Sequence, residues 1–78
     1  MEQHEIVVYT QPGCSACQQE KEFLSRRGVE FTEKNIRADL DAMQAMVRMG
    51  SQATPTTVID GEVIVGFDQR RISEKLGI

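Results

Sequence analysis

Aromatic residues and cysteines are scarce in this chain of 78 residues, which has no tryptophan, one tyrosine, three phenylalanines and two cysteines. Its core must therefore be mainly aliphatic. Two cysteines do not make the disulfide framework that supports many small secreted domains, and a bridge across so short a loop would stabilise the fold little. A chain of this length buries only about 60% of its unfolded surface on folding. We therefore expect a single small domain over residues 1–78, of modest stability.

A concentrated charge of one sign is also missing. The nine basic and twelve acidic residues are spread along the chain and give a formal net charge of −3. Without a basic block interleaved with aromatic residues, binding to nucleic acid has little support. No apolar run is long enough to span a membrane, and the acidic start, MEQHE, is typical of neither a secretory signal nor a transit peptide. These absences favour a monomer in the reducing cytoplasm, with neither nucleic acid nor membrane as a partner.

The apolar runs and the turn residues between them predict the order β-α-β-α-β-β-α. The first strand is apolar on both sides, which is typical of a central strand. A helix joins it to the second strand, so the two should be parallel, whereas Asp60-Gly61 is a strong signal for a tight hairpin. We expect an α/β fold with a four-stranded mixed sheet and helices on both faces. The strands are predicted over residues 5–10, 29–36, 56–60 and 62–66, and the helices over about 14–27, 39–49 and 68–76.

Two of the predicted helices carry recognisable start signals. Asp39 and Asp68 are plausible N-caps, because an aspartate side chain can accept a hydrogen bond from the first turn of a helix. Met43, Met46 and Met49 recur every three residues on the second helix. We interpret them as a core face rather than a metal-binding stripe, because methionine fills irregular gaps in cores.

Both cysteines lie in one stretch, YTQPGCSACQQE, where Cys14 and Cys17 are three positions apart. A structural zinc site needs four ligands, and the chain adds only one histidine to the pair. Small copper carriers also place C-x-x-C between a first strand and a first helix. They usually have a methionine where this chain has Pro12, however, and their elements follow in a different order. The remaining interpretation is a pair of inert thiols that serve only for packing. A turn after Pro-Gly should be exposed, however, and packing does not account for an exposed thiol at a helix start.

Redox chemistry is the interpretation that the local physics favours. The first N–H groups of a helix have no partners within the helix, and with the helix dipole they stabilise a thiolate at Cys14. A thiolate is the nucleophile in disulfide exchange. Cys17 lies one turn further in, where it should be less exposed and able to resolve the mixed disulfide that Cys14 forms.

A second stretch, QATPTTVIDGEVIVGFD, points to a family. Together with VVYTQPGCSACQQEKEFL it resembles a glutaredoxin or its close relative, an NrdH-redoxin, over nearly the whole chain. The resemblance implies the thioredoxin-like fold, a cis Pro55 facing the cysteines, and Cys14 and Cys17 as the catalytic pair. It also implies a substrate-binding set that consists of Gln11, Pro12, Thr54, Pro55, Gly66, Phe67 and Asp68.

Four departures from the family pattern bear on the site. The usual C-P-Y-C is C-S-A-C, the usual Gly-Gly of the later turn is Val65-Gly66, and a usual lysine or arginine is Gln11. Gln52, Arg37 or Arg70 are candidates to replace that lost cation toward a glutathione carboxylate. Glu20 stands where the helix usually carries a small residue, and either exposure to solvent or proton transfer with Cys17 would account for it.

These observations predict a thiol–disulfide oxidoreductase that reduces protein or glutathione mixed disulfides. Its partners would be disulfide-containing proteins and glutathione, with no bound cofactor and no metal. One alternative is an NrdH-like electron donor that a flavoprotein reductase, such as thioredoxin reductase, recharges. Another, from a different class, is a small copper carrier.

Overall fold

A computed structural model describes residues 4–78, and the first three residues of the MEQHE segment lie outside the described part. The predicted order of elements is confirmed. Within residues 4–78, no helix combines the length and the apolar character that crossing a bilayer would require. The elements are β1 (Ile6–Thr10), α1 (Ser15–Arg26), β2 (Thr32–Asn35), α2 (Leu40–Arg48), β3 (Thr56–Ile59), β4 (Glu62–Val65) and α3 (Gln69–Leu76).

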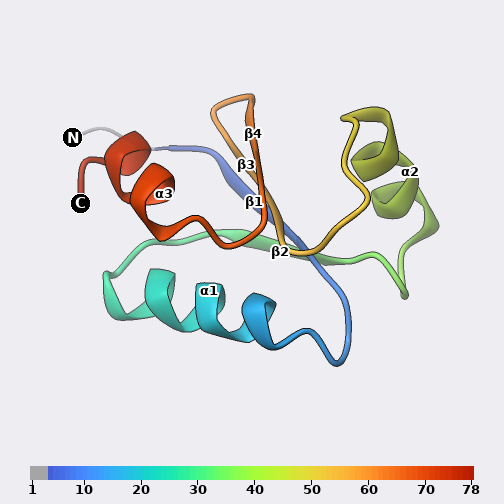
Figure 1. Ribbon diagram of the computed structural model, residues 1–78, viewed down its shortest axis with the longest axis horizontal. Coiled ribbons are helices and arrows are strands. Elements are labelled where there is room, and N and C mark those ends of the chain that lie inside the picture. Colours follow the sequence, from blue (N-terminus) through green and yellow to red (C-terminus); the bar gives the residue numbers. More distant parts are fainter. Residues whose placement is uncertain (1–3) are drawn as a thin grey trace.

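The four strands form one mixed sheet in the order β2-β1-β3-β4. β1 pairs with β2 in parallel and with β3 antiparallel, and β3 and β4 form the antiparallel hairpin. Helices α1 and α3 cover one face of the sheet and α2 covers the other (Figure 1). The predicted α/β architecture, with helices on both faces, is therefore confirmed.

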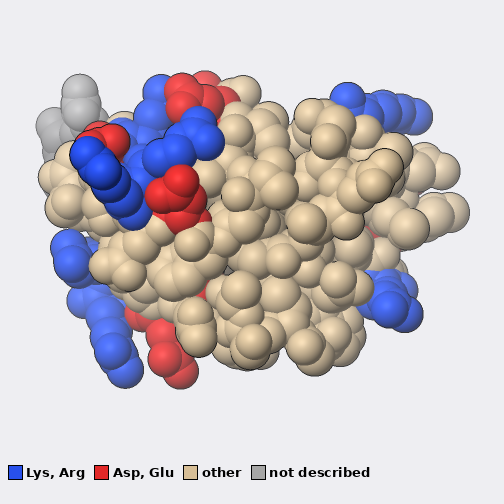
Figure 2. Space-filling model, in the orientation of Figure 1, with Lys and Arg blue, Asp and Glu red and all other residues tan. Residues whose placement is uncertain are grey.

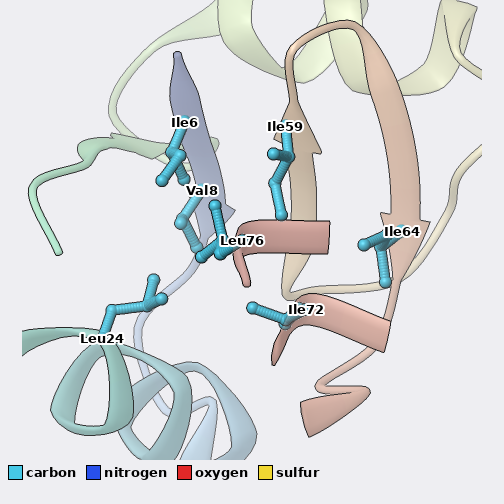
Figure 3. Packing of buried hydrophobic residues seen from close by; sticks show 7 residues of the cluster. All are labelled: Ile6, Val8, Leu24, Ile59, Ile64, Ile72 and Leu76. Atoms are coloured by element: carbon cyan, nitrogen blue, oxygen red, sulfur yellow. The ribbon is translucent and has the colours of Figure 1, made fainter. Parts of the chain in front are cut away.

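The central strand β1 has buried side chains on both faces, as its composition predicts. Ile6 and Val8 point into the larger core, whereas Tyr9 packs against α2. The larger core is aliphatic and joins the sheet to α1 and α3 (Figure 3). Burying one such side chain contributes about 1.5–3 kcal/mol. The members of this core are Ile6, Val8, Leu24, Ile59, Ile64, Ile72 and Leu76.

The second strand is shorter than predicted: β2 begins at Thr32 rather than at Val29. The reason lies in how α1 ends. Gly28 has a positive φ of 70°, and the Val29 N–H donates to the Leu24 carbonyl at 2.9 Å. This is a Schellman motif, which uses the N–H that a strand would need. Val29 and Phe31 are still half-buried and pack against the larger core.

Helix α2 confirms its predicted cap and corrects the interpretation of its methionines. The Asp39 side chain accepts a hydrogen bond from the Ala42 N–H at 3.1 Å, so it is the N-cap. Met46 is buried and Met49 packs at the border of the smaller core, but Met43 is 45% exposed. Three residues advance a helix by less than one full turn, so a run at this spacing drifts off the core face.

The predicted hairpin turn is present at Asp60-Gly61. Both residues have a positive φ, 50° and 88°, which is the signature of the two-residue turn that suits a twisted hairpin. The Asp60 side chain also accepts a hydrogen bond from the Glu5 N–H at 2.8 Å. The turn is thereby tied to the start of β1.

Candidate redox-active site

The site begins where the buried strand β1 gives way to an exposed loop. Thr10 is buried, Gln11 is half-buried, and Pro12 and Gly13 are exposed. Gly13 has a positive φ of 78°, which a glycine adopts without steric cost. The chain reverses here, and Cys14 becomes the N-cap of α1.

The two cysteines lie together at the start of α1 and are joined in a disulfide. The Cys14 sulfur accepts a hydrogen bond from the Cys17 N–H at 3.1 Å, so it satisfies one of the unpaired donors of the helix start. The two sulfurs differ in exposure, because Cys14 is half-buried while Cys17 is only 1% exposed. The predicted arrangement of an outer and an inner cysteine is present.

The Thr54–Pro55 peptide bond is cis and lies beside the cysteines, as the resemblance predicted. The Cys14 sulfur is 3.7 Å from the carbonyl oxygen of Thr54. Among residues 4–78, neither the N–H nor the C=O of Thr54 takes part in a backbone hydrogen bond. These two groups are therefore available to a bound chain beside the outer sulfur.

Gln11 connects two segments that lie far apart in the sequence. Its side-chain amide donates to the Thr54 hydroxyl at 2.9 Å, and its carbonyl accepts from the Arg37 guanidinium at 3.3 Å. Arg37 is one of the residues considered above as a replacement for the lost cation. Gln11 therefore brings a positive charge toward the Thr54 side of the site.

The turn from Gly66 to Asp68 lies next to the proline, but its side chains are engaged elsewhere. The Gly66 N–H donates to the Pro55 carbonyl at 2.7 Å. The Phe67 ring packs on Phe23 of α1, with ring centroids 5.8 Å apart. The Asp68 carboxylate accepts from the Arg71 N–H at 3.1 Å and caps α3. The side chains of Phe67 and Asp68 are thus engaged with α1 and α3.

Two buried hydroxyl groups that the sequence analysis did not single out hold the loop before the proline. The Ser51 and Thr56 hydroxyls lie 2.6 Å apart, and Thr56 also donates to the Ala53 carbonyl at 2.6 Å. Ser51 is 1% exposed and Thr56 is fully buried. A serine directly after a helix-ending glycine, with a threonine directly after the proline, is the signal that would have revealed this support.

Charge is distributed unevenly around the site. On the face that Figure 2 shows, charged side chains gather over α3 and over the far end of α1. Around α3 they pair with one another, as in the contact between Lys75 and Glu62 at 2.8 Å. The surface over the start of α1 is uncharged in this view. In the part of the chain that the structure describes, no three His, Cys, Asp or Glu side chains are placed to hold a metal ion together.

Comparisons with known proteins agree with this geometry. The sequence model of one protein family, described as glutaredoxin, matches residues 6–64. A glutaredoxin-like 8.6 kDa protein encoded in a rubredoxin operon of Clostridium pasteurianum is 31% identical over 70 residues, which cover 88% of this chain and 93% of that protein. The glutaredoxin-like protein NrdH of Lactococcus lactis subsp. cremoris is 29% identical over 62 residues, covering 80% of this chain and 86% of that one.

A solved structure has the same fold. The thioredoxin-like protein BC3987 superposes with a TM-score of 0.88 at 39% sequence identity. The superposition covers 91% of this chain and 99% of the other. The thioredoxin-like fold predicted from the sequence is thereby confirmed.

Proposed function

The chain belongs to the glutaredoxin family, and from this premise we propose that Cys14 attacks the disulfide of a substrate and that Cys17 then releases the reduced product. In the first step the Cys14 thiolate bonds to one substrate sulfur, and the other sulfur leaves as a thiolate. In the second step the Cys17 sulfur displaces the substrate from Cys14, which closes the Cys14–Cys17 disulfide. Two electrons pass to the substrate, and the protein is a thiol–disulfide oxidoreductase.

The observation that carries this assignment is the difference between the two sulfurs. Cys14 is the more exposed and caps the helix, where N–H groups and the dipole favour a thiolate. Cys17 is buried, so a substrate disulfide reaches Cys14 first. Exchange requires an accessible attacking thiolate.

The Thr54 peptide group supports a docking mode for the substrate. Its N–H and C=O have no backbone partner among residues 4–78, and the C=O lies beside the Cys14 sulfur. An extended peptide, whether a protein segment or glutathione, can pair with such groups as a strand pairs with a sheet edge. The uncharged surface over the start of α1 suits a range of protein partners.

Glutathione is the electron source that we propose for the oxidised protein. Its support is the Arg37 guanidinium on Gln11, because a guanidinium binds a carboxylate with two charge-assisted hydrogen bonds. A flavoprotein reductase is the second candidate, since one relative of this chain is named NrdH. A working dithiol needs a reducing compartment, so we place the protein in the cytoplasm.

Exchanging the cysteines one at a time tests the assignment. Cys17→Ser keeps the attacking thiol and should accumulate a mixed disulfide with glutathione after exposure to oxidised glutathione. Cys14→Ser should lose reductase activity and form little adduct, because its remaining thiol is buried. Intact-mass measurement distinguishes the two. An adduct on Cys14→Ser with none on Cys17→Ser would reverse the roles.

A further inference from the structure

The buried face of α1 carries an unexpected carboxyl group. Cys17, Glu20 and Leu24 are the buried residues of this helix, and they form one stripe facing the sheet. Cys17 is 1% exposed and Glu20 is not exposed at all. Residues three apart on a helix are neighbours, about 5–6 Å between Cβ atoms. Helical side chains also lean toward the N-terminus, so the Glu20 side chain leans toward the turn that holds Cys17.

The Glu20 carboxyl group is only half satisfied. The Thr57 hydroxyl donates a hydrogen bond to Oε2, while Oε1 is buried and has no hydrogen-bond partner among the described residues. No cation of the described chain pairs with Glu20. Burial raises the pKa of this carboxyl group, and the hydrogen bond from Thr57 offsets part of that rise. A carboxylate in this state binds a proton more readily than one held by a salt bridge.

The elements packed on this side of the sheet present few other titratable groups. β1, β4 and α3 contribute mainly aliphatic side chains there, and β3 contributes the Thr57 hydroxyl. The Thr10 hydroxyl of β1 donates to Glu33 of β2, which also pairs with Lys21 of α1 at 2.9 Å. The hydrogen bonds from Lys21 and from Thr10 lower the pKa of Glu33, so Glu33 stays charged as the partner of Lys21.

We propose that Glu20 accepts the proton of the Cys17 thiol when this thiol attacks the mixed disulfide on Cys14. The inference rests on the proposed function, in which Cys17 is the resolving residue. A thiol in apolar surroundings gives up its proton to water reluctantly, and an acceptor within the same buried stripe removes that obstacle. When glutathione reduces the disulfide again, Glu20 returns the proton to the departing Cys17 sulfur.

The step is balanced without a further reactant. The Cys17 S–H bond breaks, its proton passes to Glu20, and its electron pair forms the Cys14–Cys17 bond. The bond between Cys14 and the substrate sulfur breaks, and that sulfur leaves with its electron pair and takes a proton from water. Glu20 is then neutral, as suits a carboxyl group that no cation accompanies, and it holds this proton until the disulfide is reduced again.

The test separates the attack step from the release step. Reduced protein is mixed rapidly with excess oxidised glutathione and quenched with acid, and the mixed disulfide and the oxidised protein are followed by mass against pH. Glu20→Gln should leave attack unchanged, slow release about 10²-fold near neutral pH, and recover at high pH, where hydroxide deprotonates the thiol. Glu22→Gln, an exposed change of the same kind on the same helix, should behave like the native protein.

Two further variants protect the conclusion against a folding defect. Glu20→Asp keeps a carboxyl group and should restore much of the release rate. Thr57→Val keeps Glu20 but removes its hydrogen-bond donor, so the acid limb of the release profile should move to higher pH. If attack is normal and the release profile is unchanged in both Glu20→Gln and Thr57→Val, the role of Glu20 is overturned while the proposed function stands. Absence of any Cys14 adduct in all variants would instead overturn the proposed function.

Discussion

Replacing Glu20 with glutamine should change how the stability of the oxidised protein depends on pH. Burial raises the pKa of Glu20 above 4.5, its ordinary value. The folded protein therefore holds this proton more tightly than the unfolded chain does. Wherever the folded state binds more protons, the free energy of unfolding falls as the pH rises. The contribution is complete below pH 4.5 and is lost as the pH climbs to the raised pKa of the folded state.

The size of the effect follows from linkage. One proton difference gives a slope of at most about 1.4 kcal/mol per pH unit. A chain of 78 residues has a total stability of roughly 4–12 kcal/mol, so each pH unit inside this window removes a sizeable part of it. Glutamine does not ionise, so the slope contributed by position 20 should vanish in Glu20→Gln.

Urea denaturation of the oxidised proteins at a series of pH values measures this slope. The useful quantity is the difference between variant and native protein at each pH, because Glu33 and the other titrating groups are present in both and cancel. That difference should move in favour of Glu20→Gln as the pH rises from 4.5. Parallel curves for Glu20→Gln and the native protein would refute a buried, ionisable Glu20.

Two other outcomes follow from the site and the core. Arg37→Ala should raise KM for a glutathione mixed disulfide severalfold in a glutathione reductase-coupled assay, with Arg48→Ala as the control. Equal KM values, together with faster turnover from thioredoxin reductase, would favour the flavoprotein alternative. Leu24→Ala should lower the free energy of unfolding by about 2–5 kcal/mol, because Leu24 is fully buried, while Leu40→Ala, at a position 66% exposed, should cost far less. Similar losses for both would contradict the described core.

Local signals account for much of the fold that the sequence predicted. Asp39 and Gly50 mark the two ends of α2, and Asp60-Gly61 marks the hairpin, because each depends on backbone geometry within a few residues. The predicted start of β2 was wrong, because it rested on side-chain preference alone. Val29 has a strand-forming side chain, but its N–H is bound to the end of α1, and a residue's preference does not reveal that competition.

The features of the site also divide into those that the sequence predicted and those that depend on contacts across the fold. Cys14 at a helix start follows from the Pro-Gly turn before it, and its closeness to Thr54 came from the resemblance to a family. The bridge from Gln11 to Arg37 depends on how two side chains meet across the fold, which no local pattern contains. Glu20 was left open between exposure to solvent and proton transfer with Cys17, because a glutamate is almost never fully buried without a partner.

The ends of the described chain lie apart from the start of α1, and this separation is useful for protein engineering. The chain enters β1 beside the end of α3, and α1 begins after the opposite end of β1 (Figure 1). Ile6 and Leu76 even share one core, and the longest dimension is 33 Å. A fluorescent protein or a client enzyme fused through either end of residues 4–78 would therefore sit away from the cysteines. Such a fusion would report on redox state or deliver electrons while the surface around the cysteines stays accessible to substrates.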